Sequence, residues 1–298
     1  MRFGDRETSD NVESQRGQYS GGRGGGGLGG GAGMLISLVA SRFGIGGVLV
    51  LVVLFLIFGG IGNLTGGDRA VGPQPGQPQA QGANVCQSDQ ITRFSCQVLR
   101  STEERWTEMF REMGQQYRPP RMVFYTGGGR SGCGAADSAM GPFYCPADNR
   151  IYLDTSFFQE LQQRFQAPGD FAQAYVIAHE VGHHVQTLLG TSDRIRQAQR
   201  ATGEAQSNAL QVRMELQADC FAGAWAARER VALEQGDMEE GLRAASAIGD
   251  DTLQRRSGGA VVPESFTHGT SQQRQEALMR GFNGGGNPQV CATYTQGV

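Results

Sequence analysis

The sequence predicts an α+β protein in which a mostly helical domain with a small β-hairpin or sheet, residues 86–298, is preceded by one transmembrane helix. Three observations lead to this expectation. An apolar run without charges stands at residues 43–64, short strand-like segments stand between residues 121 and 154, and most later segments carry apolar residues at helical spacing. Strands that precede a series of helices, instead of alternating with them, favour α+β over α/β.

The chain begins with a segment at residues 1–42 that is charged and polar at its start and contains the glycine-rich stretch "SGGRGGGGLGGGAG", residues 20–33. Such a composition buries little apolar surface, so we expect a disordered tail. The linker at residues 65–85, "TGGDRAVGPQPGQPQAQGANV", is rich in Pro, Gly and Gln and is expected to remain unpacked. The folded domain should therefore begin near Cys86.

Between the tail and the linker lies "FGIGGVLVLVVLFLIFGGIGNL", residues 43–64, which carries no charged side chain. At about 1.5 Å per residue, a helix of this length spans a hydrocarbon core of about 30 Å. The alternatives are a buried core helix and a cleaved signal peptide. A core helix rarely lies between two unpacked segments, and no small-residue cleavage site follows the run. We therefore expect an uncleaved, single-pass membrane anchor.

The charges that flank this segment indicate its orientation. Arg23 and Arg42 precede it, whereas Asp68 and Arg69 nearly cancel after it. The positive-inside rule then favours a cytoplasmic N-terminus and an extracytoplasmic domain, periplasmic or extracellular. The net charge of −3 gives no basic surface for a nucleic acid, so none is expected as a partner.

All six cysteines follow the apolar segment, as disulfides formed in an oxidising compartment would require. Free, buried thiols in a cytosolic domain are the alternative. Proximity in the sequence suggests three pairs: Cys86 with Cys96, Cys133 with Cys145, and Cys220 with Cys291.

Apolar periodicity and turn residues divide the domain into elements. Pro168 and Gly169 end one helix, Asp170 is expected to cap the next, and Gly190 to end it. The expected helices cover residues 93–114, 156–165, 170–190, 207–234, 237–255 and 271–282, with a strand at 121–126 and a hairpin formed by 141–146 and 149–154.

The stretch "VIAHEVGHHVQ" holds three of the four histidines of the chain. His179, Glu180 and His183 fit the pattern H-E-x-x-H, and on a helix positions i and i+4 face the same side. The two imidazoles can then bind one Zn²⁺, while Glu180 can take a proton from a water molecule. His184 should point away from the ion and serve a structural purpose.

A zinc site needs a third protein ligand, and two candidates remain after His183. Asp193 follows in "GTSD", and Glu215 lies in the next long helix. Glu215 and Asp219 are also i and i+4, so Asp219 could accept a hydrogen bond from the outer nitrogen of His179 while Glu215 binds the metal. We favour Glu215 for this reason. His268 could stabilise an oxyanion if the chain folds back, and a surface loop is its alternative.

The motifs "HEVGHHVQ", "ELQADCFAGAW", "GPFYCPADNRIYLD" and "THGTSQQR", with the opening "RFGDRETSDNVE", resemble the bacterial neutral zinc metallopeptidases that carry an N-terminal membrane anchor. The E-x-x-A-D element is also similar to that of the Ste24/HtpX-type membrane zinc peptidases. The resemblance implies a zincin-like fold. It further implies His179, His183 and Glu215 as ligands, Glu180 as base, Asp219 as the partner of a ligand and His268 as a site residue.

These observations lead to a hypothesis of zinc-dependent hydrolysis of peptide bonds in a peptide or protein substrate. The hairpin around "FYCPADNRIYLD" could bind that substrate as an added strand, or could be an ordinary core hairpin. Two other classes remain open: a non-catalytic, membrane-anchored binding module that contains zinc, and a structural domain without metal. The intact Glu180 speaks against the binding module, because holding a metal ion does not require that carboxylate.

Overall fold

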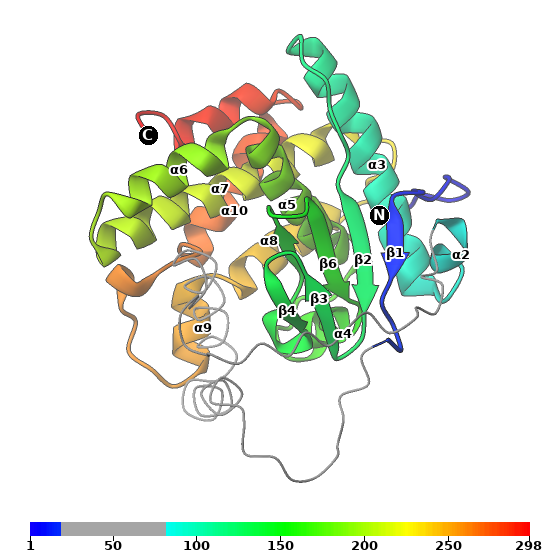
Figure 1. Ribbon diagram of the computed structural model, residues 1–298, viewed down its shortest axis with the longest axis horizontal. Coiled ribbons are helices and arrows are strands. Elements are labelled where there is room, and N and C mark those ends of the chain that lie inside the picture. The colour runs from blue at the N-terminus through cyan, green and yellow to red at the C-terminus, as the bar shows by residue number, and fades with distance from the viewer. Residues whose placement is uncertain (19–81) are drawn as a thin grey trace, which may run out of the picture.

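The computed structural model describes residues 1–18 and 82–298, which form an α+β fold (Figure 1). Its main sheet has the strand order β1–β2–β6–β5. The strands are β1 (Val12–Ser14), β2 (Arg121–Tyr125), β6 (Arg150–Asp154) and β5 (Phe143–Cys145). β2 runs parallel to both of its neighbours, and β5 is antiparallel to β6. A separate antiparallel pair is formed by β3 (Gly128–Ser131) and β4 (Gly134–Asp137).

Helices make up most of the remainder, which confirms the expected mostly helical α+β class. The α-helices are α2 (Ala83–Cys86), α3 (Gln90–Glu112), α4 (Ser156–Gln163), α5 (Asp170–Leu188), α6 (Thr191–Arg200), α7 (Glu204–Arg228), α8 (Asp237–Ala247), α9 (Asp250–Arg256) and α10 (Ser271–Asn283). The predicted strand at 121–126 and the predicted hairpin correspond to β2 and to β5–β6.

Four local expectations differ from the structure. The helix expected over 207–234 begins at Glu204 and ends at Arg228. Asp170 is the first residue of α5, not its cap, which is Gly169. The helix expected over 237–255 is broken between α8 and α9, because Gly249 packs against the start of α10, where an added Cβ would lie 2.4 Å from the Ser271 nitrogen. Helix α6 was not expected, because few of its residues are apolar. Of these apolar residues, Ile195 is buried.

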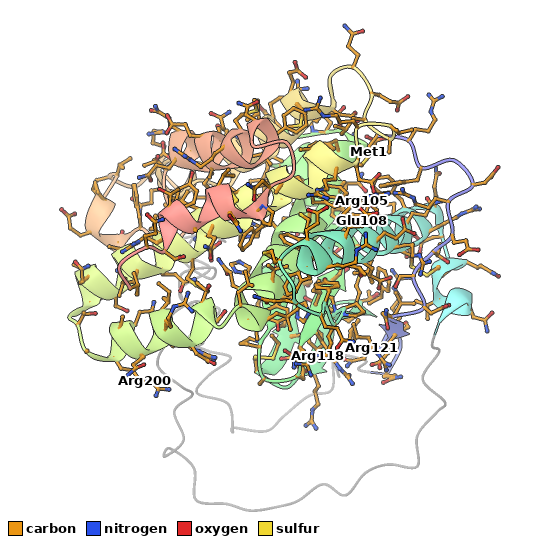
Figure 2. The ribbon with its side chains drawn as sticks, turned by 90° about the horizontal axis from the view of Figure 1, so that it is seen from above. Met1, Arg105, Glu108, Arg118, Arg121 and Arg200 are labelled. Carbon is orange, nitrogen blue, oxygen red and sulfur yellow. A yellow bond between two sulfur atoms is a disulfide. The ribbon has the colours of Figure 1, made fainter. Side chains whose placement is uncertain are left out.

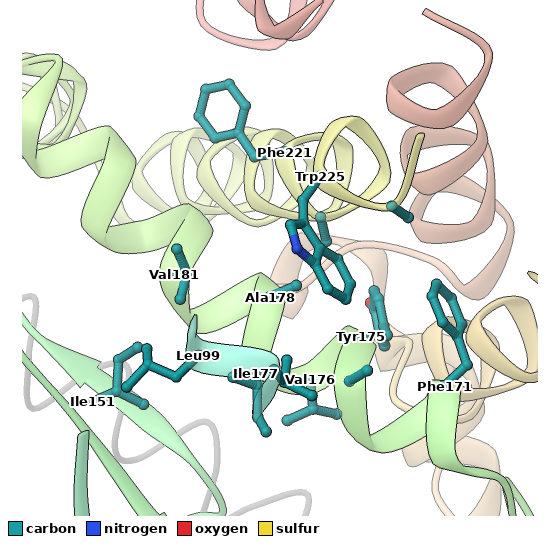
Figure 3. Close-up of a cluster of buried hydrophobic side chains, with 14 of the residues drawn as sticks. Leu99, Ile151, Phe171, Tyr175, Val176, Ile177, Ala178, Val181, Phe221 and Trp225 are labelled. Carbon is teal, nitrogen blue, oxygen red and sulfur yellow. The ribbon is translucent and has the colours of Figure 1, made fainter. Parts of the chain in front are cut away.

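The core lies where the sheet, α3, α5 and α7 meet (Figure 3). Side chains of a strand alternate between its two faces, so β2 supplies two sets. Met122 and Phe124 face the helices, while Val123 and Tyr125 pack toward the β3–β4 pair. In Figure 3, Leu99 of α3 and Ile151 of β6 approach α5 from one side, and Trp225 of α7 covers it from the other.

Two close helix contacts determine how the helical half is arranged. At Gly182 of α5, an added Cβ would lie 2.9 Å from the Ala218 carbonyl oxygen of α7. At Gly281 of α10, it would lie 1.8 Å from the Cys220 carbonyl oxygen. Glycine therefore permits backbone-to-backbone packing at both positions. The result is that α7 lies against both α5 and α10.

The expectation of a disordered tail over residues 1–42 is wrong for residues 1–18. Strand β1 adds to the edge of the sheet beside β2, and its Val12 is buried. The expectation counted apolar residues, of which this segment has few. The segment is held instead by backbone pairing and by polar side chains whose partners lie far away in the sequence. Residues 19–42 lie outside the described ranges.

The three disulfides are those expected: Cys86–Cys96, Cys133–Cys145 and Cys220–Cys291. Such bonds indicate an extracytoplasmic domain. None of the helices within 1–18 and 82–298 has both the length and the hydropathy needed to cross a bilayer. The predicted membrane anchor, residues 43–64, and nearly all of the predicted linker lie outside these ranges, and α2 begins at the last residues of that linker.

Candidate metal centre

The H-E-x-x-H residues lie on α5 and the E-x-x-x-D residues on α7. His179 and His183 are one helical turn apart on the face of α5 that meets α7. The close contact of Gly182 with Ala218 brings Glu215 of α7 opposite both histidines. The sequence predicts the spacing of these residues on each helix. The close approach of α5 to α7 depends on Gly182, which lies within the H-E-x-x-H motif.

Ligand atoms of His179, His183 and Glu215 all lie within 4.8 Å of one another. The two Nε2 atoms are 3.1 Å apart. Glu215 Oε2 lies 3.2 Å from His179 Nε2, and Glu215 Oε1 lies 3.6 Å from His183 Nε2. Ligands arranged tetrahedrally at about 2.0–2.1 Å from zinc lie about 3.3–3.4 Å from one another. The three residues therefore fit a zinc ion and leave its fourth position open.

The outer nitrogens of both histidines are occupied, and this fixes where the inner nitrogens point. His179 Nδ1 lies 2.8 Å from Asp219 Oδ1, and His183 Nδ1 lies 2.9 Å from Gln186 Oε1. Each acceptor holds a proton on Nδ1 and so directs Nε2 toward the space between the three residues. Two lone pairs and a carboxylate directed at one point repel one another unless a cation lies between them. Gln186 was not expected from the sequence, although it belongs to the "HEVGHHVQ" motif.

Asp219, the expected partner of a ligand, is itself held by two residues that the sequence did not identify. Arg274 of α10 donates to both of its oxygens, from Nε at 2.8 Å and from Nη2 at 2.9 Å. The Tyr175 hydroxyl donates to Oδ1 at 2.6 Å. Arg274 is fully buried. Its presence in the "THGTSQQR" motif was the available signal, but only the α7–α10 contact reveals its partner.

The charge of the site suits a cation. Burial raises the pKa of Asp219, but the neighbouring charges, Arg274 first, outweigh it and lower the pKa to about 2. Burial also raises the pKa of Glu215, yet His183 and His179 bring it well below its usual range. Burial lowers the pKa of His179, whereas Asp219 raises it, to about 10. A proton and a metal ion thus compete for the same His179 nitrogen.

Glu180 lies beside this group and lines a cavity of about 480 Å³ together with His179, His183 and Glu215. Its side chain is buried, and burial raises its pKa. The strand β5 forms one wall of the cavity through Phe143 and Tyr144. Much of the remaining wall is apolar and comes from separate elements, including Met140, Phe157, Phe165, Val176, Ile195, Met214 and Leu253.

His268 also lines this cavity, so the chain does fold back as the sequence hypothesis required. Asp250 holds the His268 segment by accepting the backbone N–H groups of Thr267, His268 and Gly269 at 2.7, 2.6 and 3.0 Å. It also lies 3.2 Å from His268 Nδ1. Burial lowers the pKa of His268, but the charge of Asp250 raises it above its usual value.

The remaining candidates lie elsewhere. Asp193 is on α6, where its side chain is 80% exposed and pairs with Arg196, so it does not join the ligand group. His184 points away from it, as expected, with Nε2 donating to the Arg118 carbonyl at 2.6 Å and Nδ1 lying 3.1 Å from the Tyr144 hydroxyl. A second cluster of acidic residues consists of Asp170, Asp237 and Glu240, and the α-amino group of Met1 pairs with the first two.

Comparison with known proteins adds an independent finding. Residues 1–294 match the family model described as "Putative neutral zinc metallopeptidase". The chain is 46% identical over 303 residues to "Uncharacterized protein YpfJ" of Escherichia coli K12, covering 100% of both chains. It is 42% identical over 193 residues to "Uncharacterized protein Rv2575" of Mycobacterium tuberculosis H37Rv, covering 60% of this chain and 64% of that one. No solved structure matches the chain significantly.

Proposed function

The chain belongs to the neutral zinc metallopeptidase family, and from this membership and the geometry of the site we propose that it is a membrane-anchored enzyme that hydrolyses peptide bonds. The observation that carries the proposal is the convergence of His179, His183 and Glu215 beside the buried carboxyl group of Glu180. We further propose that the fold is zincin-like, with the H-E-x-x-H helix beneath an antiparallel edge strand.

His179, His183 and Glu215 would hold the zinc ion, and Asp219 would orient His179. When bound at such a site, zinc lowers the pKa of water toward about 7 and polarises a carbonyl group. The donor set supports zinc because two imidazoles and one carboxylate are ligands that zinc enzymes use, with one position left open.

Glu180 would act as the general base. It projects into the cavity next to the ligands, where it can accept a proton from water and later deliver that proton to the leaving amine. Its burial supports this role, because a raised pKa brings a carboxyl group closer to the working pH of a base that must also act as an acid.

His268 would donate a hydrogen bond to the oxyanion that forms on the substrate carbonyl. It lines the same cavity, and Asp250 restrains both its backbone and its Nδ1 atom. The charge of Asp250 raises the pKa of His268 and so favours the protonated ring, which stabilises negative charge better than a neutral one.

An extended peptide would bind along β5. This strand ends the sheet order, so within the described residues only β6 pairs with it, and its side chains line the cavity. Backbone hydrogen bonds to such an edge bind a peptide independently of its sequence. The apolar walls would then favour substrates with bulky apolar side chains near the cleaved bond.

The three disulfides support an extracytoplasmic position for this domain, and the apolar sequence of residues 43–64 supports attachment to the membrane. A cytoplasmic N-terminus does not belong to this proposal, because residues 1–18 pack against the domain.

The test compares the full chain with its Glu180→Gln variant, both purified in detergent and loaded with zinc. Cleavage of a mixed peptide pool is followed by mass spectrometry, and zinc content is measured in parallel. We expect cleavage by the parent alone and equal zinc content in both proteins. Equal cleavage by both proteins would rule out Glu180 as the base. Zinc binding without cleavage by either would favour a binding module.

A further inference from the structure

Residues 1–18 form a structural part of the domain that carries the metal site. Strand β1 pairs with β2 in parallel register, from Val12 opposite Met122 to Ser14 opposite Phe124. The Met122 nitrogen donates to the Asn11 oxygen at 2.9 Å, and the Gln15 nitrogen donates to the Phe124 oxygen at 2.8 Å. β2 also pairs with β6, so the N-terminal segment extends the same sheet that borders the cavity.

Buried polar side chains of this segment find their partners on the domain. Glu13 is 3% exposed and accepts hydrogen bonds from Arg121 and, at 2.9 Å, from Arg150. Figure 2 shows Arg121 beside β1. Ser9 and Asn11 both donate to the Glu103 carboxylate of α3, at 2.6 and 2.8 Å. A buried carboxylate without partners is strongly destabilising. Glu13 and Glu103 obtain their partners only when residues 1–18 are docked on the domain, so these hydrogen bonds favour the docked state.

The residues that precede and follow the 19–81 segment lie next to each other. The Gly82 nitrogen donates to the Val12 oxygen at 3.1 Å. The Arg16 guanidinium donates to Ser88 at 3.0 Å and to Asp89 at 3.1 Å, just before α3. The described residues on either side of the 19–81 gap thus meet at one place on the domain.

We infer that residues 1–18 lie on the same side of the membrane as the metal site. A chain that crossed the bilayer once, between residues 43 and 64, would separate them by a hydrocarbon core of about 30 Å, and β1 could not reach β2. The flanking arginines predicted a cytoplasmic N-terminus. If the domain is extracytoplasmic, the packing of β1 on β2 requires the N-terminus to be extracytoplasmic as well. The inference rests on packing alone and is independent of peptidase activity.

Cysteine labelling in the full chain tests the inference. Glu7, whose side chain is 87% exposed, and Val231, which is fully exposed, are replaced one at a time by cysteine. The six native cysteines are all in disulfides and should not react. Spheroplasts are treated with a membrane-impermeant maleimide before and after lysis. We expect the two positions to label alike in intact spheroplasts, both if the domain is outside and neither if it is inside. Labelling of one position alone would overturn the inference.

A melting experiment tests the docking itself. Val12→Asp places a carboxylate at a buried position of β1, whereas Glu7→Val changes an exposed one. In the purified full chain, Val12→Asp should lower the melting temperature by about 5 °C or more. Glu7→Val should leave it unchanged. Equal melting temperatures for parent and Val12→Asp would show that the segment is not docked and would overturn the inference.

Discussion

The Arg274 guanidinium and the Asp219 carboxylate form a doubly hydrogen-bonded ion pair that is closed to solvent, directly behind His179, a proposed metal ligand. The pair joins α10 to α7 and fixes the Asp219 oxygen that accepts from His179 Nδ1. A side chain far along the sequence therefore determines how the imidazole faces the metal position. Arg274 and His179 act on Asp219 in the same direction, because both stabilise its carboxylate form and lower its pKa.

Asp219→Asn should weaken zinc binding by about 10–100-fold, because an amide orients and polarises His179 less well than a carboxylate does. It should also cost about 3–5 kcal/mol of stability, since Arg274 would remain buried without a counter-charge. Competition with a zinc chelator and thermal melting measure the two effects. Adding Arg274→Gln should restore stability but not zinc affinity. An unchanged zinc affinity in Asp219→Asn would contradict the orienting role.

Gln186→Leu should lower zinc affinity, because His183 Nδ1 would lose its acceptor and the ring would no longer be held with Nε2 toward the metal. The expected loss is about 10-fold, the lower end for an outer partner of a ligand. Gln275→Leu is the matched control, since Gln275 donates to the Leu242 carbonyl and contacts none of the proposed ligands. A smaller loss in Gln186→Leu than in the control would refute the assignment.

Tyr144→Phe should raise KM for peptides several-fold while zinc content stays at the level of the parent. The Tyr144 hydroxyl joins β5 to His184 on α5, and its loss leaves a buried ring nitrogen without a partner, at a cost of about 1–3 kcal/mol. The edge strand that is proposed to bind substrate would then be less firmly placed. Tyr152→Phe, in the neighbouring strand and with its hydroxyl on Asp148, should change KM little. Equal effects of the two changes would count against a role for β5.

The His268–Asp250 pair should make stability depend on pH. The folded-state pKa of His268 is raised, so its contribution is complete below about 6.5 and is lost as the pH rises through the raised value. The pKa of Asp250 is lowered, so its contribution is present above about 3.8 and is lost on acidification. Metal-free parent and His268→Gln proteins are compared by melting at pH 5.5 and pH 9. The advantage of the parent should be larger at pH 5.5, and an advantage that grows with pH would disprove the coupling.

The sequence was sufficient where the chemistry is local. The i, i+4 spacing of His179 and His183, and of Glu215 and Asp219, follows from helical geometry, and the disulfide pairing agreed with simple proximity for Cys86 and Cys133. Of the two candidates for the third ligand, Glu215 is the one that lies with His179 and His183 in the structure. Asp193 lies instead on the exposed face of a short helix.

The sequence was insufficient where contacts join distant segments. Nothing local to Arg274 shows that it holds Asp219, because this contact arises from the packing of α10 on α7. Gln186 is local to His183, one turn along α5, but its residue type alone did not mark it as a partner of the histidine. The N-terminal segment was misjudged for the same reason. Its polar residues look solvated in isolation, but Glu13 and Ser9 meet Arg150 and Glu103 only in the folded domain.

The most direct measurement of the central claim is zinc K-edge X-ray absorption on the full chain loaded with one equivalent of zinc. Ligation by His179, His183 and Glu215 predicts two imidazole nitrogens and carboxylate oxygen at about 2.0–2.1 Å, and no sulfur. Glu215→Gln should change the oxygen shell while both imidazole signals remain. Sulfur ligands at about 2.3 Å, or a spectrum with no imidazole scattering, would contradict the metal centre described for this protein.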